Sequence, residues 1–118
     1  MAVAMAISAM AAEQTIYIGT RSAEGRSEGI YRARFDSVTG ALSGVTLAAK
    51  TPSPTFLQVH PTRPLVYAVA AVPEGKVRAF AVEADGSLRL LNEVSSKGAG
   101  PAHVQIDRTG KWVATANF

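Results

Sequence analysis

Residues 54–70 read PTFLQVHPTRPLVYAVA, and the same pattern returns without a gap at residues 101–117, which read PAHVQIDRTGKWVATAN. The two stretches share identical Pro, Gln, Thr and Val residues, all at an offset of 47 residues. Three further pairs stay apolar, namely Leu57/Val104, Val59/Ile106 and Leu65/Trp112. A recurring period of this length is the sequence signature of a repeat architecture. A sandwich of unrelated strands would have no cause to repeat residue identities at a fixed spacing.

Each repeat contains four short segments rich in Val, Leu and aromatic residues, a composition that favours β-strands. In the complete copy these segments are residues 56–60, 65–70, 77–83 and 88–94. Turn-forming residues separate them, and Asp85-Gly86 between two apolar runs is a strong hairpin signal. Four antiparallel strands in a repeat of about 40–50 residues are typical of a β-propeller blade. The sequence therefore predicts an all-β chain built from four-stranded antiparallel blades.

The repeat divides the chain into consecutive blades, with residues 12–118 as the N-terminal part of a propeller domain. Blade 1, residues 15–51, lacks its inner strand; blade 2, residues 54–97, is complete; residues 101–118 start blade 3. A closed propeller ring needs at least about four blades, whereas this chain supplies about two and a third. We expect a fragment that is inactive alone and needs the missing blades of its own propeller as partners.

The first residues differ from the repeat region in composition. Residues 1–12, MAVAMAISAMAA, are apolar and uncharged, and Ala9-Met10-Ala11 has the small–x–small pattern that signal peptidase recognises. We expect residues 1–11 to be a signal peptide, or the remainder of a longer one, with export to the periplasm or the extracellular space. Because no Lys or Arg precedes the apolar run, an N-terminal helix and a cytoplasmic location remain the alternative.

The composition excludes several classes of function. The 118 residues carry 12 Lys+Arg against 9 Asp+Glu, and this net charge of +3 includes no basic run, so nucleic acid is not an expected partner. The absence of cysteine removes disulfides, thiolate metal sites and cysteine nucleophiles. No apolar run reaches the roughly 18 residues of a membrane span. Two histidines without a carboxylate cluster do not predict a metal site, and no cofactor is expected.

Three segments resemble a known family. Residues 17–20 (YIGT), residues 29–36 (GIYRARFD) and residues 98–118 (GAGPAHVQIDRTGKWVATANF) are similar to the N-terminal third of the seven-bladed β-propeller lactonases. That family includes bacterial 6-phosphogluconolactonases and the fungal carboxymuconate-lactonising enzyme. The resemblance covers about residues 15–118. It implies that the parent protein hydrolyses a sugar lactone, that its ligand is a small lactone or sugar acid, and that a C-terminal strand completes blade 1.

A second hypothesis for the function stays open, because the sequence departs from the family pattern at two places and because export is predicted. Ala70-Ala71 stands where the family often has Asn-Glu, and Phe118 replaces the closing Tyr. An exported protein would not meet a phosphorylated cytoplasmic intermediate. Because a fold does not fix a function, the alternative is a non-catalytic exported propeller that binds or scaffolds.

His103 is the candidate catalytic residue. It lies near the start of an inner strand, which lines the funnel of a propeller, and the equivalent position one blade earlier is Phe56. A scaffold that accepts a hydrocarbon there has no structural need for an imidazole. An imidazole can act as a general base or as a donor to an oxyanion when a lactone opens, and the resemblance also implies a His here. The alternative is that His103 caps the turn at residues 98–101 or bonds a neighbouring blade.

Asn117 and Arg21 are the candidates for substrate binding. The Asn117 amide could point toward the funnel or toward the next blade. Arg21 belongs to a loop rich in Ser, Gly and Glu and could bind a sugar acid, with an ordinary solvated loop as the alternative. His60 aligns with Asp107, and a polar residue at this position in both copies predicts a turn cap rather than a site.

Overall fold

The computed structural model describes residues 13–22 and 25–118, and the expected signal peptide lies outside the described residues. The described residues form nine strands: β1 (Glu13–Ile18), β2 (Gly29–Asp36), β3 (Leu42–Lys50), β4 (Leu57–Val59), β5 (Leu65–Ala70), β6 (Lys76–Val82), β7 (Leu88–Ser95), β8 (Pro101–Ile106) and β9 (Val113–Asn117). The all-β prediction is confirmed. The largest boundary difference is at β1, which begins at Glu13 rather than at residue 15.

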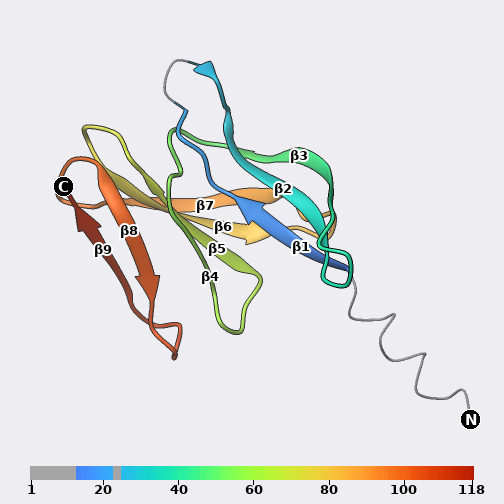
Figure 1. Ribbon diagram of the computed structural model, residues 1–118. Coiled ribbons are helices and arrows are strands. Elements are labelled where there is room, and N and C mark those ends of the chain that lie inside the picture. The colour runs from blue at the N-terminus through green and yellow to red at the C-terminus, as the bar shows by residue number, and fades with distance from the viewer. Residues whose placement is uncertain (1–12, 23–24) are drawn as a thin grey trace, which may run out of the picture.

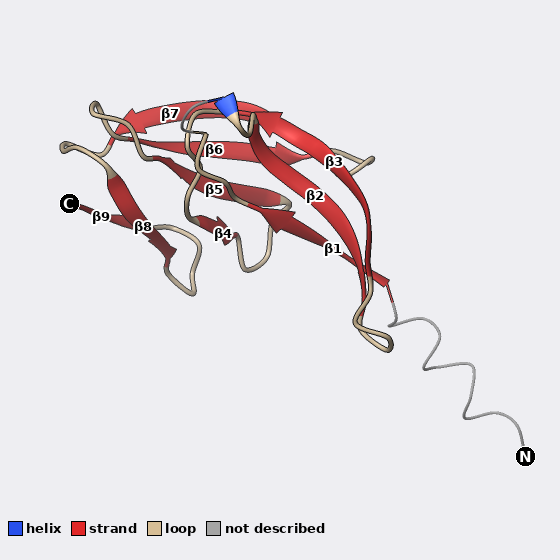
Figure 2. Cartoon of the chain, turned by 45° about the horizontal axis from the view of Figure 1, so that its top comes forward, coloured by secondary structure: helices blue, strands red, loops and turns tan. Residues whose placement is uncertain are grey.

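The strands form three antiparallel sheets, in the orders β1-β2-β3, β4-β5-β6-β7 and β8-β9. Figure 1 shows the sheets side by side, with the complete four-stranded sheet between the other two, and Figure 2 shows the same arrangement from another angle. Consecutive strands pair through short turns, as in the blades of a propeller. Within the described part of the chain, no helix is long and apolar enough to cross a membrane.

Strand β5 of the middle sheet is buried on both faces. Val66 and Ala68 are fully buried in one cluster with Ile30 of the first sheet, whereas Val69 lies in a second cluster with Val104 of β8. Alternate residues of a strand point to opposite faces, so a strand between two sheets must be apolar on both. This accounts for the continuous apolar run of β5. Full burial of a Val or Ile side chain contributes about 1.5–3 kcal/mol.

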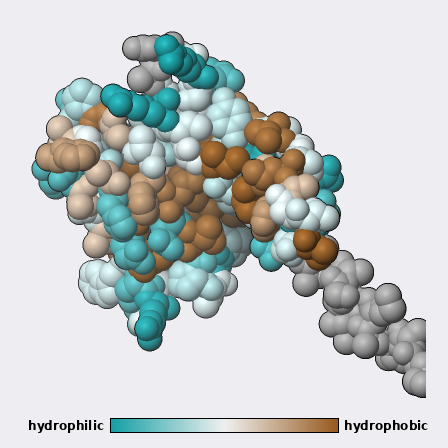
Figure 3. Space-filling view, in the orientation of Figure 1, coloured by the Kyte–Doolittle hydropathy of each residue, from teal (hydrophilic) through white to brown (hydrophobic). Residues whose placement is uncertain are grey.

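Large apolar side chains also remain exposed on several of the described strands and turns. Large examples are Val38, Leu42, Val45, Leu47, Val59, Leu90, Leu91, Val94, Trp112, Val113 and Phe118. Figure 3 shows apolar surface across the middle of one face, between more polar ends. In a propeller, faces of this kind pack against the next blade.

Polar contacts tie the first sheet to the second. The Tyr17 hydroxyl donates to the carbonyl of Gly86 at 2.8 Å, and burial raises the pKa of Tyr17, which keeps this donor protonated. The Arg78 guanidinium donates to the Thr51 hydroxyl at 2.8 Å and forms an ion pair with Glu93 at 2.9 Å. The Tyr17–Gly86 and Arg78–Thr51 hydrogen bonds fix the two sheets against each other in addition to their apolar cluster, whereas the Arg78–Glu93 ion pair joins the neighbouring strands β6 and β7.

Asp107 caps the turn between β8 and β9. Its Oδ1 accepts the backbone N–H groups of Lys111 at 3.0 Å and Trp112 at 2.9 Å. Its Oδ2 accepts the N–H of Thr109 at 3.2 Å and also the Thr109 hydroxyl. A single carboxylate therefore satisfies three backbone donors that a six-residue turn would otherwise leave to water. The predicted turn role is confirmed for Asp107.

His60 performs the same task one repeat earlier. Its Nδ1 accepts the N–H groups of Thr62 at 3.1 Å and Arg63 at 3.0 Å, so the ring proton resides on Nε2. That Nε2 lies 3.3 Å from the carbonyl oxygen of Gly110 and donates to it across the sheet boundary. Gly110 has a φ of 71°, a conformation that favours glycine. A Cβ at this position would also lie 2.3 Å from Nε2, so space excludes a larger residue as well. His60 is a buried structural histidine.

Replacing His60 tests this cap. His60→Ala leaves two backbone donors without an acceptor, so we expect the free energy of unfolding to fall by about 1–3 kcal/mol. His60→Asn keeps an acceptor near the position of Nδ1 and should retain most of the stability. Urea-induced unfolding of both variants measures the difference. Equal losses in the two variants would show that the acceptor is unimportant.

Asp107 makes the stability of its turn depend on pH. Hydrogen bonds from the Thr109 hydroxyl and then the Trp112 N–H lower the pKa of Asp107 from 3.8 to about 2. Because the folded state favours the carboxylate, the stabilisation is complete above the ordinary pKa of 3.8 and disappears as the pH falls toward about 2. Carboxyl-carbon NMR should show this titration, and Asp107→Asn should remove this turn's share of the acid sensitivity. A pKa at or above 3.8 would contradict the assignment.

Candidate functional site

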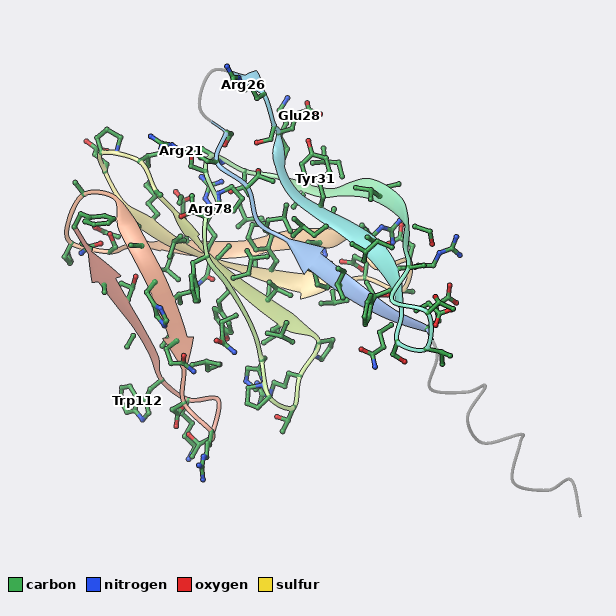
Figure 4. All side chains as sticks on the ribbon, in the orientation of Figure 1. Arg21, Arg26, Glu28, Tyr31, Arg78 and Trp112 are labelled. Carbon is green, nitrogen blue, oxygen red and sulfur yellow. The ribbon has the colours of Figure 1, made fainter. Side chains whose placement is uncertain are left out.

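A cleft opens at the end of the molecule where β8 begins. It has a volume of about 430 Å³ and is lined by Arg21, Ser53, Thr55, Ala71, Gly100, Pro101, Ala102 and Phe118. These residues come from the loop after β1, the β3–β4 and β7–β8 connections, the ends of β5 and β9, and the start of β8. Figure 4 shows Arg21 at this end and Trp112 near the opposite end. Parts of all three sheets therefore converge on one cleft.

His103 lies in β8, directly after the cleft-lining Ala102. The pairing of β8 with β9 shifts register between Pro101 and His103, which marks a β-bulge, a device that redirects side chains next to functional sites. The centroid of the imidazole lies 4.2 Å from that of the Phe56 ring, with 32° between the planes. The two repeat-equivalent residues therefore meet at the boundary between neighbouring sheets, and Phe56 forms an aromatic wall for the imidazole.

Both nitrogens of His103 are available. The side chain is exposed, and among the described residues the imidazole has no hydrogen-bond partner. Only the backbone carbonyl of His103 is engaged, accepting the Thr115 hydroxyl at 2.7 Å. An exposed imidazole with unoccupied nitrogens can take up or deliver a proton. The alternative of a turn cap finds no supporting contact here, in contrast to His60.

Asn117 stabilises the β7–β8 connection, which contributes Gly100 to the lining of the cleft. Its Nδ2 donates to the carbonyl of Ser96 at 2.8 Å, across the β7–β8 connection. The amide also fills the space beside Gly98, where a Cβ would lie 2.5 Å from Nδ2. The equivalent residue one repeat earlier is Ala70, which has no such group. The contact is structural, and substrate binding by the remaining Oδ1 stays a prediction.

Arg21 lies on the cleft wall with an exposed side chain, and its carbonyl accepts the Ser27 hydroxyl at 3.0 Å. A guanidinium carries five N–H donors, suited to the oxygens of a sugar acid. The three predicted residues thus gather at one end: Arg21 in the cleft, His103 at its border and Asn117 behind its wall. Substrate contact by each of them stays a prediction.

Ser53 and Thr55 line the cleft although neither was predicted from the sequence as a cleft residue. Ser53 stands 47 residues before Gly100, so the two positions are equivalent in the repeat. This exchange of glycine for serine was the available signal. The described residues contain no cluster of three or more His, Cys, Asp or Glu side chains that could hold a metal ion.

Together, the stacked antiparallel sheets and the turn caps repeated at the same place in the 47-residue period define a segment of a β-propeller. The family described as "Lactonase, 7-bladed beta-propeller" matches residues 15–118. The chain therefore belongs to the seven-bladed β-propeller lactonase family, and the resemblance found in the sequence is confirmed.

Individual relatives agree with this assignment. The chain is 36% identical over 104 residues to a 6-phosphogluconolactonase of Bacillus subtilis, covering 86% of this chain and 30% of the relative. It superimposes with a TM-score of 0.82 on the structure of a candidate 6-phosphogluconolactonase of Bacteroides uniformis, at 34% identity, covering 91% of this chain and 31% of that one. A second candidate, from Bacteroides fragilis, gives 0.82 at 32% identity, covering 92% and 30%. The chain thus spans about 30% of the length of its relatives.

Substitution of Asn117 tests its structural role. Asn117→Ala removes the hydrogen bond to Ser96, and we expect the free energy of unfolding to fall by about 0.5–1.5 kcal/mol. Asn117→Asp should lose more, because an ionised carboxylate cannot donate to a carbonyl and repels it. Urea unfolding of the three proteins at neutral pH measures both effects. Full stability in Asn117→Ala would show that the amide does not hold the connection.

Proposed function

We propose that this chain supplies the N-terminal blades of a propeller lactonase that hydrolyses a sugar lactone. The observation that carries the proposal is the exposed imidazole of His103, whose nitrogens find no partner among the described residues, at the border of a cleft that contains Arg21. The B. subtilis relative, a 6-phosphogluconolactonase, supports the class of reaction. The remaining blades of the parent protein complete the funnel in this proposal.

His103 acts as the general base. An imidazole nitrogen takes a proton from a water molecule, whose oxygen attacks the lactone carbonyl. The resulting tetrahedral oxyanion is stabilised by hydrogen-bond donors, and the guanidinium of Arg21 binds the other oxygens of the sugar at the same end of the molecule. The ring C–O bond then breaks, the imidazolium returns its proton to the departing ring oxygen, and the product is an open hydroxy acid.

The proposal places this hydrolase outside the cytoplasm. Its support is the composition of residues 1–11, with the small–x–small pattern at Ala9-Met10-Ala11. In that location the substrate is a free sugar lactone rather than a phosphorylated intermediate, and the reaction belongs to the metabolism of carbohydrates.

The test is lactone hydrolysis by the full-length protein that carries this chain. His103→Phe is the sharpest variant, because Phe occupies the equivalent position 56 and keeps the aromatic contact while removing both nitrogens. We expect kcat on gluconolactone to fall by roughly 10²-fold or more, with an unchanged melting temperature. A pH-stat records the acid released.

His103→Gln serves as a second variant, because its amide keeps a hydrogen-bonding group but cannot act as a base near neutral pH. It should be as inactive as His103→Phe. Wild-type rates in either variant would remove His103 from the mechanism. A wild-type protein that binds a sugar acid but turns over no lactone would favour the binding or scaffold alternative.

A further inference from the structure

Ser53 occupies a backbone conformation that suits glycine. Its φ is 43°, and the repeat-equivalent Gly100 has a φ of 54°. Apart from Ser53, Lys97 is the one non-glycine residue at positive φ in the described part of the chain. A side chain at this φ is strained, and such strain persists where the surroundings impose it, often at ligand sites. At position 53 the chain keeps a hydroxyl where the next repeat has relieved the strain with glycine.

The hydroxyl of Ser53 ties two distant segments together. Its Oγ accepts the backbone N–H of Ser22 at 3.3 Å, and the two hydroxyl oxygens lie 3.5 Å apart. In return, Ser22 Oγ accepts the backbone N–H of Ser53. The Ser53 carbonyl accepts the N–H groups of Thr55 at 2.8 Å and Ala71 at 3.0 Å. We call the reciprocal hydrogen bonds between the two serines the Ser22–Ser53 clasp. The clasp joins the loop after β1 to the β3–β4 connection. The Ser53 carbonyl then links this connection to the end of β5.

The clasp acts directly beside Arg21. Ser22 follows Arg21 in the chain, and Arg21 and Ser53 both line the cleft. Figure 4 shows Arg21, Arg26 and Glu28 in the same upper part of the view. The backbone of a surface loop is generally mobile, and a long side chain on it then has no fixed starting point. Fixing the backbone at Ser22 fixes the point on the cleft wall from which the Arg21 side chain extends.

We propose that Ser22 and Ser53 are positioning residues that hold Arg21 in place to bind the oxygens of the bound sugar lactone or sugar acid. The inference rests on the proposed function for its ligand class. It assigns a role to the strained serine that packing does not explain, because glycine satisfies the same backbone position at residue 100. The clasp contributes to ligand binding through Arg21, whereas His103 contributes to the chemical step.

The experiment uses variants of the full-length protein. Ser53→Gly keeps the backbone conformation and removes the hydroxyl, and Ser22→Ala removes the other half of the clasp. We expect either change to raise the KM for gluconolactone and the dissociation constant of gluconate by roughly 3- to 10-fold, because about one hydrogen bond is lost. The kcat should stay nearly unchanged. Ser22→Thr retains a hydroxyl and should restore wild-type values. The melting temperature of Ser53→Gly should not fall.

A double-mutant cycle separates positioning from general damage. If Ser53 acts through Arg21, Ser53→Gly should add nothing to the loss of gluconate affinity already caused by Arg21→Ala. Amide hydrogen exchange at Arg21 and Ser22 should also accelerate in Ser53→Gly. Additive effects, or wild-type gluconate affinity in Ser53→Gly, would overturn the proposal.

The ligand measurements also distinguish the two proposals. Gluconate affinity that depends on the clasp, without any lactone turnover, would leave the positioning role intact and refute hydrolysis. Lactone turnover with a KM that neither serine substitution changes would support hydrolysis and refute the positioning role. A wild-type protein that binds neither gluconate nor gluconolactone, measured by calorimetry, would refute both.

Discussion

The burial of β5 on both faces is the interaction on which the described structure depends. Val66 and Ala68 on one face and Val69 on the other draw a sheet onto each side, so the three sheets stack in chain order. Stacking brings the start of one inner strand beside the start of the next. The contact between Phe56 and His103 follows from this geometry, because positions 47 residues apart become neighbours at the sheet boundary. A site at that boundary therefore depends on the apolar core behind it.

The turns show that one backbone problem can be solved with different chemistry. Asp107 and His60 occupy the same place in the repeat, and each accepts the N–H groups of the following turn. The carboxylate does so as a charge in water, whereas the buried imidazole also reaches Gly110 of the neighbouring sheet. The identity of the capping residue thus decides whether a turn is solvated or forms part of a sheet interface.

Most of the fold and part of the site could be predicted from the sequence. The 47-residue period located the strands and identified position 60/107 as a cap, because period and turn chemistry are local properties. The clasp could not be predicted, since it joins residues 31 positions apart. It also depends on the positive φ of Ser53, which the residue type does not indicate. The Asn117 amide was equally inaccessible, because its direction is set by a connection about 20 residues earlier. Local rules predict elements, and non-local contacts decide side-chain roles.

The hydrogen bonds of His60 have a consequence for reactivity. Its Nδ1 lone pair accepts two amides and its Nε2 carries the proton, so the ring presents no lone pair to an incoming electrophile. His103, the other histidine of the chain, keeps an open lone pair on an exposed ring. The same side chain is therefore fully engaged in hydrogen bonds in one repeat and exposed without a hydrogen-bond partner among the described residues in the next.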